Sequence, residues 1–315
     1  MIGILEELLQ MVLVLAAAPL LTGIVRQTKA RLVGRRGPSP IQPYRDLLRL
    51  LRKEAVIAEN ASWLFRVTPY LVFAALWLAA SLVPTFSTGL ALQSTADLIA
   101  LVALLASARF MTALAGLDVG TSFGGIGSSR DMMIASFAEP AMLLVIFTVS
   151  IVAGSTALAE VADFMRAGTV GLRVSLAMAL VAFTMVALAE NARIPVDNPA
   201  THLELTMVHE AMVLEYSGRH LALIEAAGML KLLFYISLII CVFAPWGLAA
   251  PEDGVAVTIA GLAVWASKLL LGAIALGVFE TSVAKMRVFR VSEFLAGALL
   301  LGVLAVIFLY VSRGL

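Results

Sequence analysis

The sequence predicts an all-α, polytopic membrane protein, and three observations support that prediction. Apolar residues fill 61% of the 315 positions and charged residues 14%, against about a quarter charged in soluble domains. The mean hydropathy is +1.00. The apolar residues fall into runs of about 20, the length of a membrane-spanning helix. A soluble enzyme and a disordered chain are thereby excluded, and the net charge of +1 excludes a nucleic-acid binder, which needs a basic surface.

Eight segments are long and apolar enough to span a bilayer, within a single integral membrane domain over residues 1–315. Helices are expected because a barrel strand alternates apolar and polar residues, whereas 295–309 is apolar throughout. The first segment starts with Glu6 and Glu7 and ends without a small-residue cleavage site, so we expect a retained span. The expected spans are 2–25, 63–86, 95–116, 133–158, 170–190, 221–246, 255–279 and 292–312.

The single cysteine, Cys241, lies inside an apolar run. It can form neither an intrachain disulfide nor a cysteine-ligated metal cluster from this chain alone. His202 and His209 are seven residues apart and share a helix face, but no third ligand stands at a recognised spacing. We therefore favour two packing histidines over a metal site, and we expect no cofactor bound by this chain.

The connecting segments predict an orientation through their charge. Lys and Arg are dense in the loop 26–62 and recur in the loop 280–291, whereas 87–94 and 247–254 contain neither. Because basic residues accumulate on the cytoplasmic side, the loops 26–62, 117–132, 191–220 and 280–291 are expected to be cytoplasmic. Both termini are then expected on the non-cytoplasmic side.

An amphipathic helix is expected inside the first cytoplasmic loop. Its apolar positions follow the i, i+3, i+4, i+7 rule, and basic residues take the other face. The apolar set is Tyr44, Leu47, Leu48 and Leu51, and the basic set is Arg45, Arg49, Arg52 and Lys53. Such a helix either lies on anionic lipid headgroups or shapes a cavity mouth and docks a partner. The sequence leaves both interpretations open.

The segment 190–218 is dense in acidic residues where a span ends. It is much longer than the roughly two to eight residues of an ordinary helix connection. The apolar residues within it predict a helix over 200–214 that is packed into the protein and carries Glu204 and Glu210 into a partly buried setting. Burial and neighbouring charges move carboxyl pKa values towards neutrality, as a proton relay requires.

Some charged residues sit well inside the apolar runs of the expected spans, among them Glu139, Glu225, Lys231 and Lys268. A charge at mid-membrane costs about 2.5–3.5 kcal/mol on insertion scales, so such residues face the bundle interior and pair or line a water path. A structural ion pair and a proton path are both consistent with them. Glu139 precedes Pro140, and a proline frees a backbone carbonyl that water can satisfy.

The segment 116–131 is glycine-rich, but no strand precedes it as a phosphate-binding loop requires. We expect a closely packed cytoplasmic turn. Ser128 and Asp131 have the spacing of a capping box for the helix that follows.

Several motifs together resemble the quinone-site membrane subunit of complex I. Arg35-Arg36-Gly37-Pro38, followed by Gln42, Asp46 and Lys53-Glu54, is similar to the first cytoplasmic loop of that family. The segment from Glu190 to Asp197 resembles its acidic loop, and Glu215-Tyr216-Ser217 resembles the motif that closes the loop. The resemblance extends over all eight expected spans.

Two departures point to a related branch. Complex I members typically continue with Glu-Ala-Glu where this chain has Ala200-Thr201-His202, and Glu215 stands three residues further on. The segments 199–215 and 285–290 resemble instead the related subunit of energy-converting group 4 [NiFe]-hydrogenases, including formate hydrogenlyase. These departures argue against a quinone site.

The resemblance implies a membrane anchor and proton-path subunit that is not catalytic alone, in a bacterial or archaeal cytoplasmic membrane. Its implied partners are hydrogenase large and small subunits, iron–sulfur subunits and antiporter-like membrane subunits. The [NiFe] centre and the iron–sulfur clusters are expected in those partners. The alternatives are a true complex I quinone-site subunit and, more weakly, a stand-alone ion transporter, which would show internal repeats.

These arguments predict which residues form the proton path, which act as countercharges and which dock a partner. The expected proton path comprises Glu139, Glu190, Asp197, Glu204, Glu215, Glu225 and Lys268. Arg130 and Arg193 are the expected countercharges, with Arg193 one helical turn beyond Glu190 if the helix continues. The expected partner-docking residues are Arg35, Arg36, Gly37, Pro38, Gln42 and Asp46.

Overall fold

The computed structural model describes residues 2–167, 173–197, 208–250 and 252–314, and in these ranges the chain forms eleven α-helices and no sheet. The helices are α1 (Ile2–Leu32), α2 (Gln42–Leu51), α3 (Trp63–Leu82), α4 (Leu98–Asp118), α5 (Ser122–Ala153), α6 (Leu158–Arg166), α7 (Val174–Glu190), α8 (His209–Val213), α9 (Gly218–Phe243), α10 (Val255–Ser282) and α11 (Val288–Gly314). A short 3₁₀ turn spans Gln93–Thr95.

The predicted spans are confirmed. Seven of the described helices, α1, α3, α4, α5, α9, α10 and α11, are long and apolar enough to cross a membrane, and α7 is a shorter apolar helix. At 1.5 Å per residue, the 17 residues of α7 extend only about 25 Å. The fifth expected span, 170–190, is therefore the short one, and its helix ends at Glu190.

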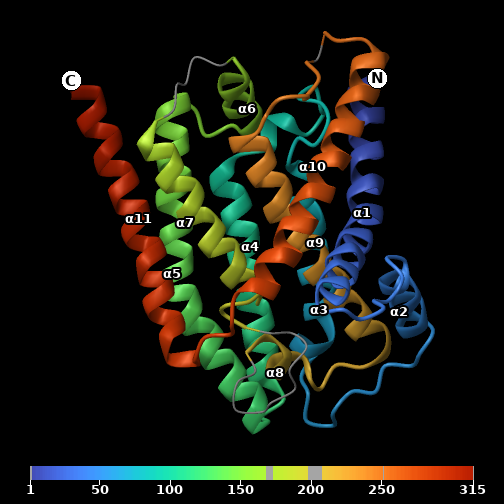
Figure 1. Ribbon diagram of the computed structural model, residues 1–315. Helices are drawn as coiled ribbons and strands as arrows, with labels where there is room; N and C mark the ends of the chain where they lie inside the picture. Colours follow the sequence, from blue (N-terminus) through green and yellow to red (C-terminus); the bar gives the residue numbers. More distant parts are fainter. Residues whose placement is uncertain (1, 168–172, 198–207, 251, 315) are drawn as a thin grey trace.

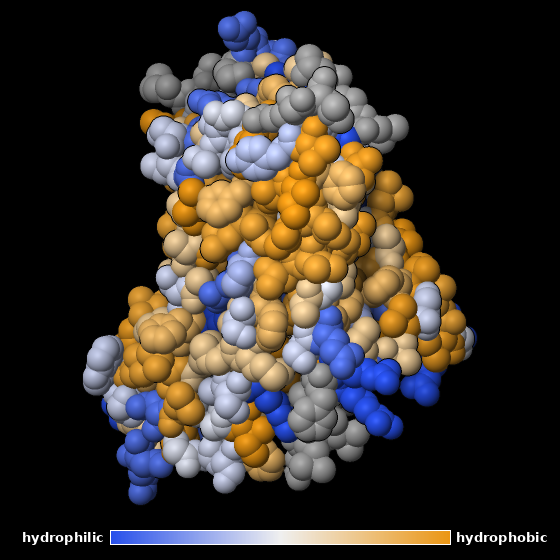
Figure 2. Space-filling model, turned by 90° about the vertical axis from the view of Figure 1, so that its left-hand side faces the viewer, coloured by the Kyte–Doolittle hydropathy of each residue, from blue (hydrophilic) through white to orange (hydrophobic). Residues whose placement is uncertain are grey.

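The long helices run antiparallel, so that α1 begins and α11 ends at the same end of the bundle (Figure 1). We call this the terminal end. The opposite end, where α1 finishes and α8 lies, is called the loop end. On the face shown in Figure 2, apolar side chains form a broad belt between more hydrophilic ends. That pattern is the one expected of a multi-pass membrane protein.

The glycine-rich segment differs from its prediction. Helix α5 already begins at Ser122, with the Thr121 hydroxyl accepting a hydrogen bond from the Gly124 amide at 3.2 Å. The expected turn and the Ser128–Asp131 capping box are therefore wrong. The glycines serve helix packing instead, because a side-chain carbon at Gly124 would collide with the Gly116 carbonyl of α4.

Two further boundaries differ from those expected. Helix α1 continues to Leu32, seven residues beyond the predicted end of the first span, into the basic sequence. A short amphipathic helix, α6, follows α5 at the terminal end and was not predicted. The predicted amphipathic helix of the first loop is confirmed as α2.

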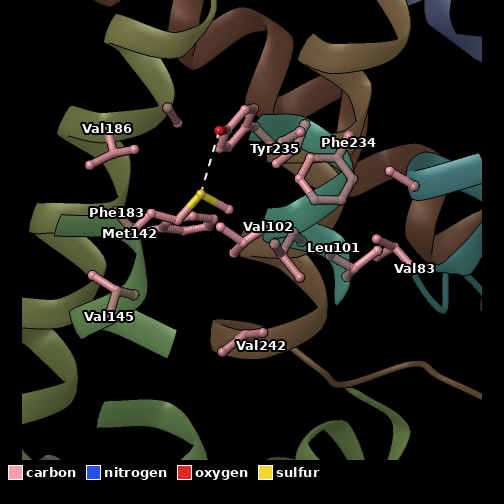
Figure 3. Packing of buried hydrophobic residues seen from close by; sticks show 14 of the residues in the cluster. Val83, Leu101, Val102, Met142, Val145, Phe183, Val186, Phe234, Tyr235 and Val242 are labelled. Atoms are coloured by element: carbon pink, nitrogen blue, oxygen red, sulfur yellow. Dashed lines mark hydrogen bonds between the residues drawn. The ribbon is translucent and has the colours of Figure 1, made fainter. Parts of the chain in front are cut away.

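A buried core joins α4, α5, α7 and α9. Phe183 of α7 lies beside Met142 of α5, and Tyr235 of α9 faces both (Figure 3). The Tyr235 hydroxyl donates a hydrogen bond to the Met142 sulfur at 3.6 Å. Leu101 of α4 is fully buried in the same cluster. Close packing of this kind leaves side chains few alternative positions, so α4, α5, α7 and α9 form a rigid frame.

Candidate functional site

Arg109 of α4 is the centre of a buried ionic group. Its Nη1 lies 2.7 Å from Oε1 of Glu190 and 3.9 Å from Oε1 of Glu139, while its Nε lies 3.3 Å from Oδ2 of Asp131. Lys231 of α9 approaches the second oxygen of Glu190 at 2.8 Å. The Arg109 and Glu190 side chains are only 5% and 6% exposed. We call these five residues the central ionic group.

The position of Glu190 at the end of α7 explains its need for two cations. The last carbonyls of a helix carry partial negative charge, which disfavours a carboxylate there. Arg109 and Lys231 come from two other helices and offset both the carboxylate and the helix terminus. The planar guanidinium presents five donors in a fixed fork, whereas the ammonium group of lysine presents three from a single point on a flexible stem.

The central ionic group has more acids than bases. Glu139, Glu190 and Asp131 face only Arg109 and Lys231 among the described ion pairs. With every group ionised, the sum of these five charges is −1. Three carboxyl groups therefore share two cations in this group.

Two cavities meet at Arg109. An inner cavity of about 60 Å³ is bordered by Arg109, Glu190, Lys231, Asp197 and His209, among others. A polar cavity of that size holds a few water molecules, since each needs about 10–15 Å³. A wider pocket of about 530 Å³ between α4 and α5 is bordered by Arg109 and Glu139. Arg109 therefore separates the two spaces, with Glu190 on one side and Glu139 on the other.

A second ionic group lies at the loop end of α10. Glu280, whose side chain is 1% exposed, receives Lys29 of α1 at 2.6 Å and Nη1 of Arg193 at 3.4 Å. We call these three residues the peripheral ionic group. Burial lowers the pKa of the Arg193 guanidinium, and the Glu280 carboxylate opposes that effect.

The segment 191–197 connects the two groups. Arg193 binds Glu280, and Asp197 accepts a hydrogen bond from Lys285 at 2.7 Å. The Met286 amide also donates to the Pro195 carbonyl at 2.9 Å. Three contacts thus attach the segment that follows Glu190 to the end of α10 and to the connection between α10 and α11.

The expected pairing of Glu190 with Arg193 is wrong. Helix α7 stops at Glu190, and Ala192 adopts a positive φ of 47°. The chain therefore turns away, and Arg193 reaches Glu280 instead. The countercharges of Glu190 are Arg109 and Lys231. Arg130, the other expected countercharge, lies half-buried on α5 next to Asp131.

The structure brings together some of the predicted proton-path residues and separates others. Glu139 and Glu190 belong to the central ionic group, and Asp197 borders the inner cavity. Glu225 lies on α9 near Arg26 and Asp46. Lys268 lies towards the terminal end, where it donates to the Ala244 carbonyl at 2.6 Å and lies 4.6 Å from the centre of the Trp246 ring.

The remaining predicted residues lie near the loop end or outside the described ranges. Glu204 and His202 are outside the described residues, as is most of the predicted helix 200–214, while His209–Val213 forms α8. Within the described ranges, no cluster of three or more His, Cys, Asp or Glu side chains has the arrangement of a metal site.

The Glu215-Tyr216-Ser217 motif anchors the end of the acidic segment. Tyr216 stacks on Phe65 with ring centres 3.9 Å apart and donates to the Phe65 carbonyl at 3.0 Å. Burial raises the pKa of the Tyr216 hydroxyl. Ser217 bonds the amide and the carbonyl of Val56, while Glu215 is exposed.

Sequence reasoning missed Arg109 and Glu280. Arg109 is the one basic residue of the expected span 95–116, and the rule that ionisable residues within membrane spans are functional would have identified it. Glu280 and its partner Lys29 stand just beyond the ends that we predicted for their spans. They therefore looked like ordinary residues of polar loops.

A helical bundle of membrane-spanning length, with charged groups paired between its helices, defines a multi-pass membrane protein. The profile of the NADH dehydrogenase family matches residues 6–311. The chain therefore belongs to that family.

Two relatives match about nine-tenths of the chain, and a third is more distant. Formate hydrogenlyase subunit 4 of Escherichia coli is 34% identical over 285 residues, covering 90% of this chain and 92% of the relative. Hydrogenase-4 component C of the same bacterium is 33% identical over 280 residues, covering 89% and 87%. NADH-ubiquinone oxidoreductase chain 1 of Triticum aestivum is more distant, at 28% over 236 residues, which cover 69% of this chain and 72% of that one.

A solved structure shares the fold. A chain of the membrane-bound sulfane sulfur reductase, an archaeal respiratory membrane complex, superposes with a TM-score of 0.80 at 20% identity. The superposition covers 96% of this chain and 98% of the other. The order and packing of the helices described above are therefore found in a chain of distant sequence.

Proposed function

We propose that this chain is the membrane anchor and proton-path subunit of a complex of the formate hydrogenlyase or hydrogenase-4 type. In this proposal, electron transfer in a docked [NiFe]-hydrogenase arm is coupled to ion translocation through the chain. The observation that carries the proposal is the central ionic group, with an excess carboxyl group and a cavity on either side of Arg109. The similarity to formate hydrogenlyase subunit 4 over 90% of the chain supports it.

The central ionic group would move a proton in two steps. Glu190 takes up a proton from water in the inner cavity and loses its attraction for Arg109, which then favours Glu139 at 3.9 Å. When Glu190 passes that proton to Glu139, the ionised Glu190 holds Arg109 again, and Glu139 keeps the proton beside the wider pocket until it releases it there. Asp197, on the inner cavity, and Glu204, Glu215 and Glu225 would extend the path towards the loop end.

The proposed orientation places the loop end in the cytoplasm, with both termini outside, in a bacterial or archaeal cytoplasmic membrane. The exposed turn that contains Arg35, Arg36, Gly37 and Pro38 lies at this end and, with Gln42 and Asp46, would contact the arm. Hydrogenase large and small subunits and iron–sulfur subunits would form that arm and hold the [NiFe] centre and the clusters. Antiporter-like subunits would be its neighbours in the membrane.

Glu190→Gln tests the proposal, because it keeps the size of the side chain and removes its titration. We expect the complex to assemble while hydrogen evolution coupled to proton movement falls at least about tenfold, or about 1.4 kcal/mol of barrier. The measurement is hydrogen production and uptake of a pH-sensitive dye in vesicles that contain the purified complex. Asp163→Asn, on α6 at the terminal end, is the matched control and should leave both signals unchanged. Full activity and full proton movement in the Glu190→Gln complex would refute the proposal.

A quinone-site subunit is the second candidate, and the similarity to NADH-ubiquinone oxidoreductase chain 1 favours it. The two functions predict different behaviour of the purified complex. Saturable quinone reduction that competitive quinone-site inhibitors block would support the second candidate. Hydrogen evolution that is insensitive to such inhibitors would support the first.

A further inference from the structure

Helix α2 presents three parallel stripes, each with i, i+4, i+7 spacing. The first stripe, Pro43, Leu47 and Leu50, lies against the protein, where α2 packs on α1 and α9. The second stripe, Tyr44, Leu48 and Leu51, is apolar, and its two leucines are 55% and 51% exposed. The third stripe, Arg45, Arg49 and Arg52, is basic and exposed. The outward side of α2 is thus half apolar and half basic, divided along the helix axis.

A second observation is the position of α2 along the axis of α1. The chain after α1 runs back along that helix. Gly37 lies against Gln27 and Ala30 of α1. Further back, the Pro40 carbonyl lies so close to Gly23 that any side chain at position 23 would collide with it. The Tyr44 hydroxyl then donates a hydrogen bond to the Ala16 carbonyl. Gly23 precedes the end of α1 by nine residues, or about 14 Å. Helix α2 therefore lies beside the apolar part of α1 and not beyond its end.

An exposed apolar stripe at that level would contact acyl chains, and an arginine stripe beside it needs a negative partner. Arg49 approaches Asp46 at 3.6 Å, and Asp46 is the only acidic residue of α2. Guanidinium groups bind phosphate with paired hydrogen bonds. A phospholipid headgroup offers that phosphate at the boundary where its own acyl chains can cover Leu48 and Leu51.

We propose that α2 is a binding site for anionic phospholipid, with phosphate groups on the stripe Arg45, Arg49 and Arg52 and acyl chains on Leu48 and Leu51. The site is distinct from the expected protein-docking residues, because Arg35 and Arg36 lie beyond the end of α1, while Gln42 and Asp46 lie on a fourth line of α2, outside the two outward stripes. It does not depend on the proposed proton path. Its function is to hold α2, and through Tyr44 the middle of α1, at a fixed depth.

The test uses the purified complex in nanodiscs that contain a photoreactive phosphatidylglycerol. We expect cross-links on α2 that fall roughly 30-fold in an R45Q/R52Q variant, which corresponds to about 1 kcal/mol for each of the two charges. The matched control, R287Q/R290Q, removes two basic residues at the same end of the bundle, in the connection to α11 and its first turn, and should leave the α2 cross-links unchanged. L48Q/L51Q should also weaken them while keeping every charge.

Several outcomes would overturn the proposal. Equal cross-linking of α2 by a photoreactive phosphatidylcholine would show that the basic stripe makes no selection. Full competition by inorganic phosphate would show that the stripe binds a free anion and not a lipid. Cross-links from Leu48, Arg49 or Leu51 to another subunit in the intact complex would show that a protein covers this face. If R45Q/R52Q prevents assembly, the L48Q/L51Q variant and the two competition experiments still decide the question.

Discussion

The central and peripheral ionic groups are built from the same kinds of side chain but in opposite proportion. The central group sets three carboxyl groups against two cations, whereas the peripheral group sets Glu280 against Lys29 and Arg193. The central group borders two cavities, and the three peripheral side chains border neither of them. The central group joins four packed helices, while the peripheral one attaches α10 to α1 and to the segment after α7.

In the proposed function, this difference separates a group that exchanges protons from a group that holds the structure. Water beside a carboxyl group gives a proton a route in and out, and an excess of acid lets the group keep it. Glu280 has neither property, since it is enclosed and outnumbered by cations. The peripheral group is therefore interpreted as a clamp that fixes the segment 191–197 and, through it, the position of Glu190.

The largest expected effect comes from breaking the clamp. Glu280→Gln leaves Lys29 and Arg193 without their carboxylate, and removing one partner of a buried ion pair costs about 3–5 kcal/mol. We expect a marked fall in the thermal unfolding temperature of the purified complex. Turnover per assembled complex should change far less. If the Glu280→Gln complex keeps its thermal stability but loses proton-coupled turnover, the peripheral group carries the proton and the clamp interpretation is wrong.

The spans and α2 could be predicted because their signals are local. An apolar run of about 20 residues or a repeat of i, i+4, i+7 is complete within one segment. The partners in the ionic groups are not local, since Arg193 and Glu280 are 87 positions apart. Only the packing of α4, α5, α7 and α9 brings Arg109 to Glu190. Sequence reasoning therefore selected Glu139 and Glu190 for the proton path but paired Glu190 with Arg193, the nearest arginine in the chain.

The glycine-rich segment shows the other limit of sequence reasoning. Glycine is typical of turns, and it is equally typical of places where two backbones approach closely. In this chain the second reason applies, because Gly124 faces the Gly116 carbonyl and Gly127 faces Ala211 of α8. Such a contact depends on what lies opposite, and one sequence does not contain that information.

An intermediate effect is expected from Arg109→Lys, which keeps the positive charge of the central group. Lysine has a single compact ammonium group, so it cannot hold Glu190 at 2.7 Å and Asp131 at 3.3 Å together as the guanidinium does. We expect roughly a tenfold loss of proton-coupled turnover, about 1.4 kcal/mol, with assembly retained. Lys231→Arg is the matched exchange and should have less effect, because Lys231 approaches Glu190 alone. Equal losses in both variants would show that charge alone matters.

The smallest effect concerns His209, which borders the inner cavity from α8. Burial lowers the pKa of its imidazole. Asp131 and Asp197 oppose that effect, while Lys231 and Arg109 add to it.

The sign of the pH dependence follows from this shift. The unfolded chain binds a proton at the ordinary histidine pKa of about 6.5, whereas the folded protein binds it only at lower pH. Stability is therefore complete above about pH 6.5 and decreases as the pH falls towards the lowered value. We expect His209→Gln to reduce the acid-induced fall in the thermal unfolding temperature by an amount equivalent to about 1 kcal/mol or less. An unchanged fall between pH 7.5 and 5.5 in that variant would show that the cavity tolerates a charged imidazole, and that the central ionic group is better hydrated than its burial indicates.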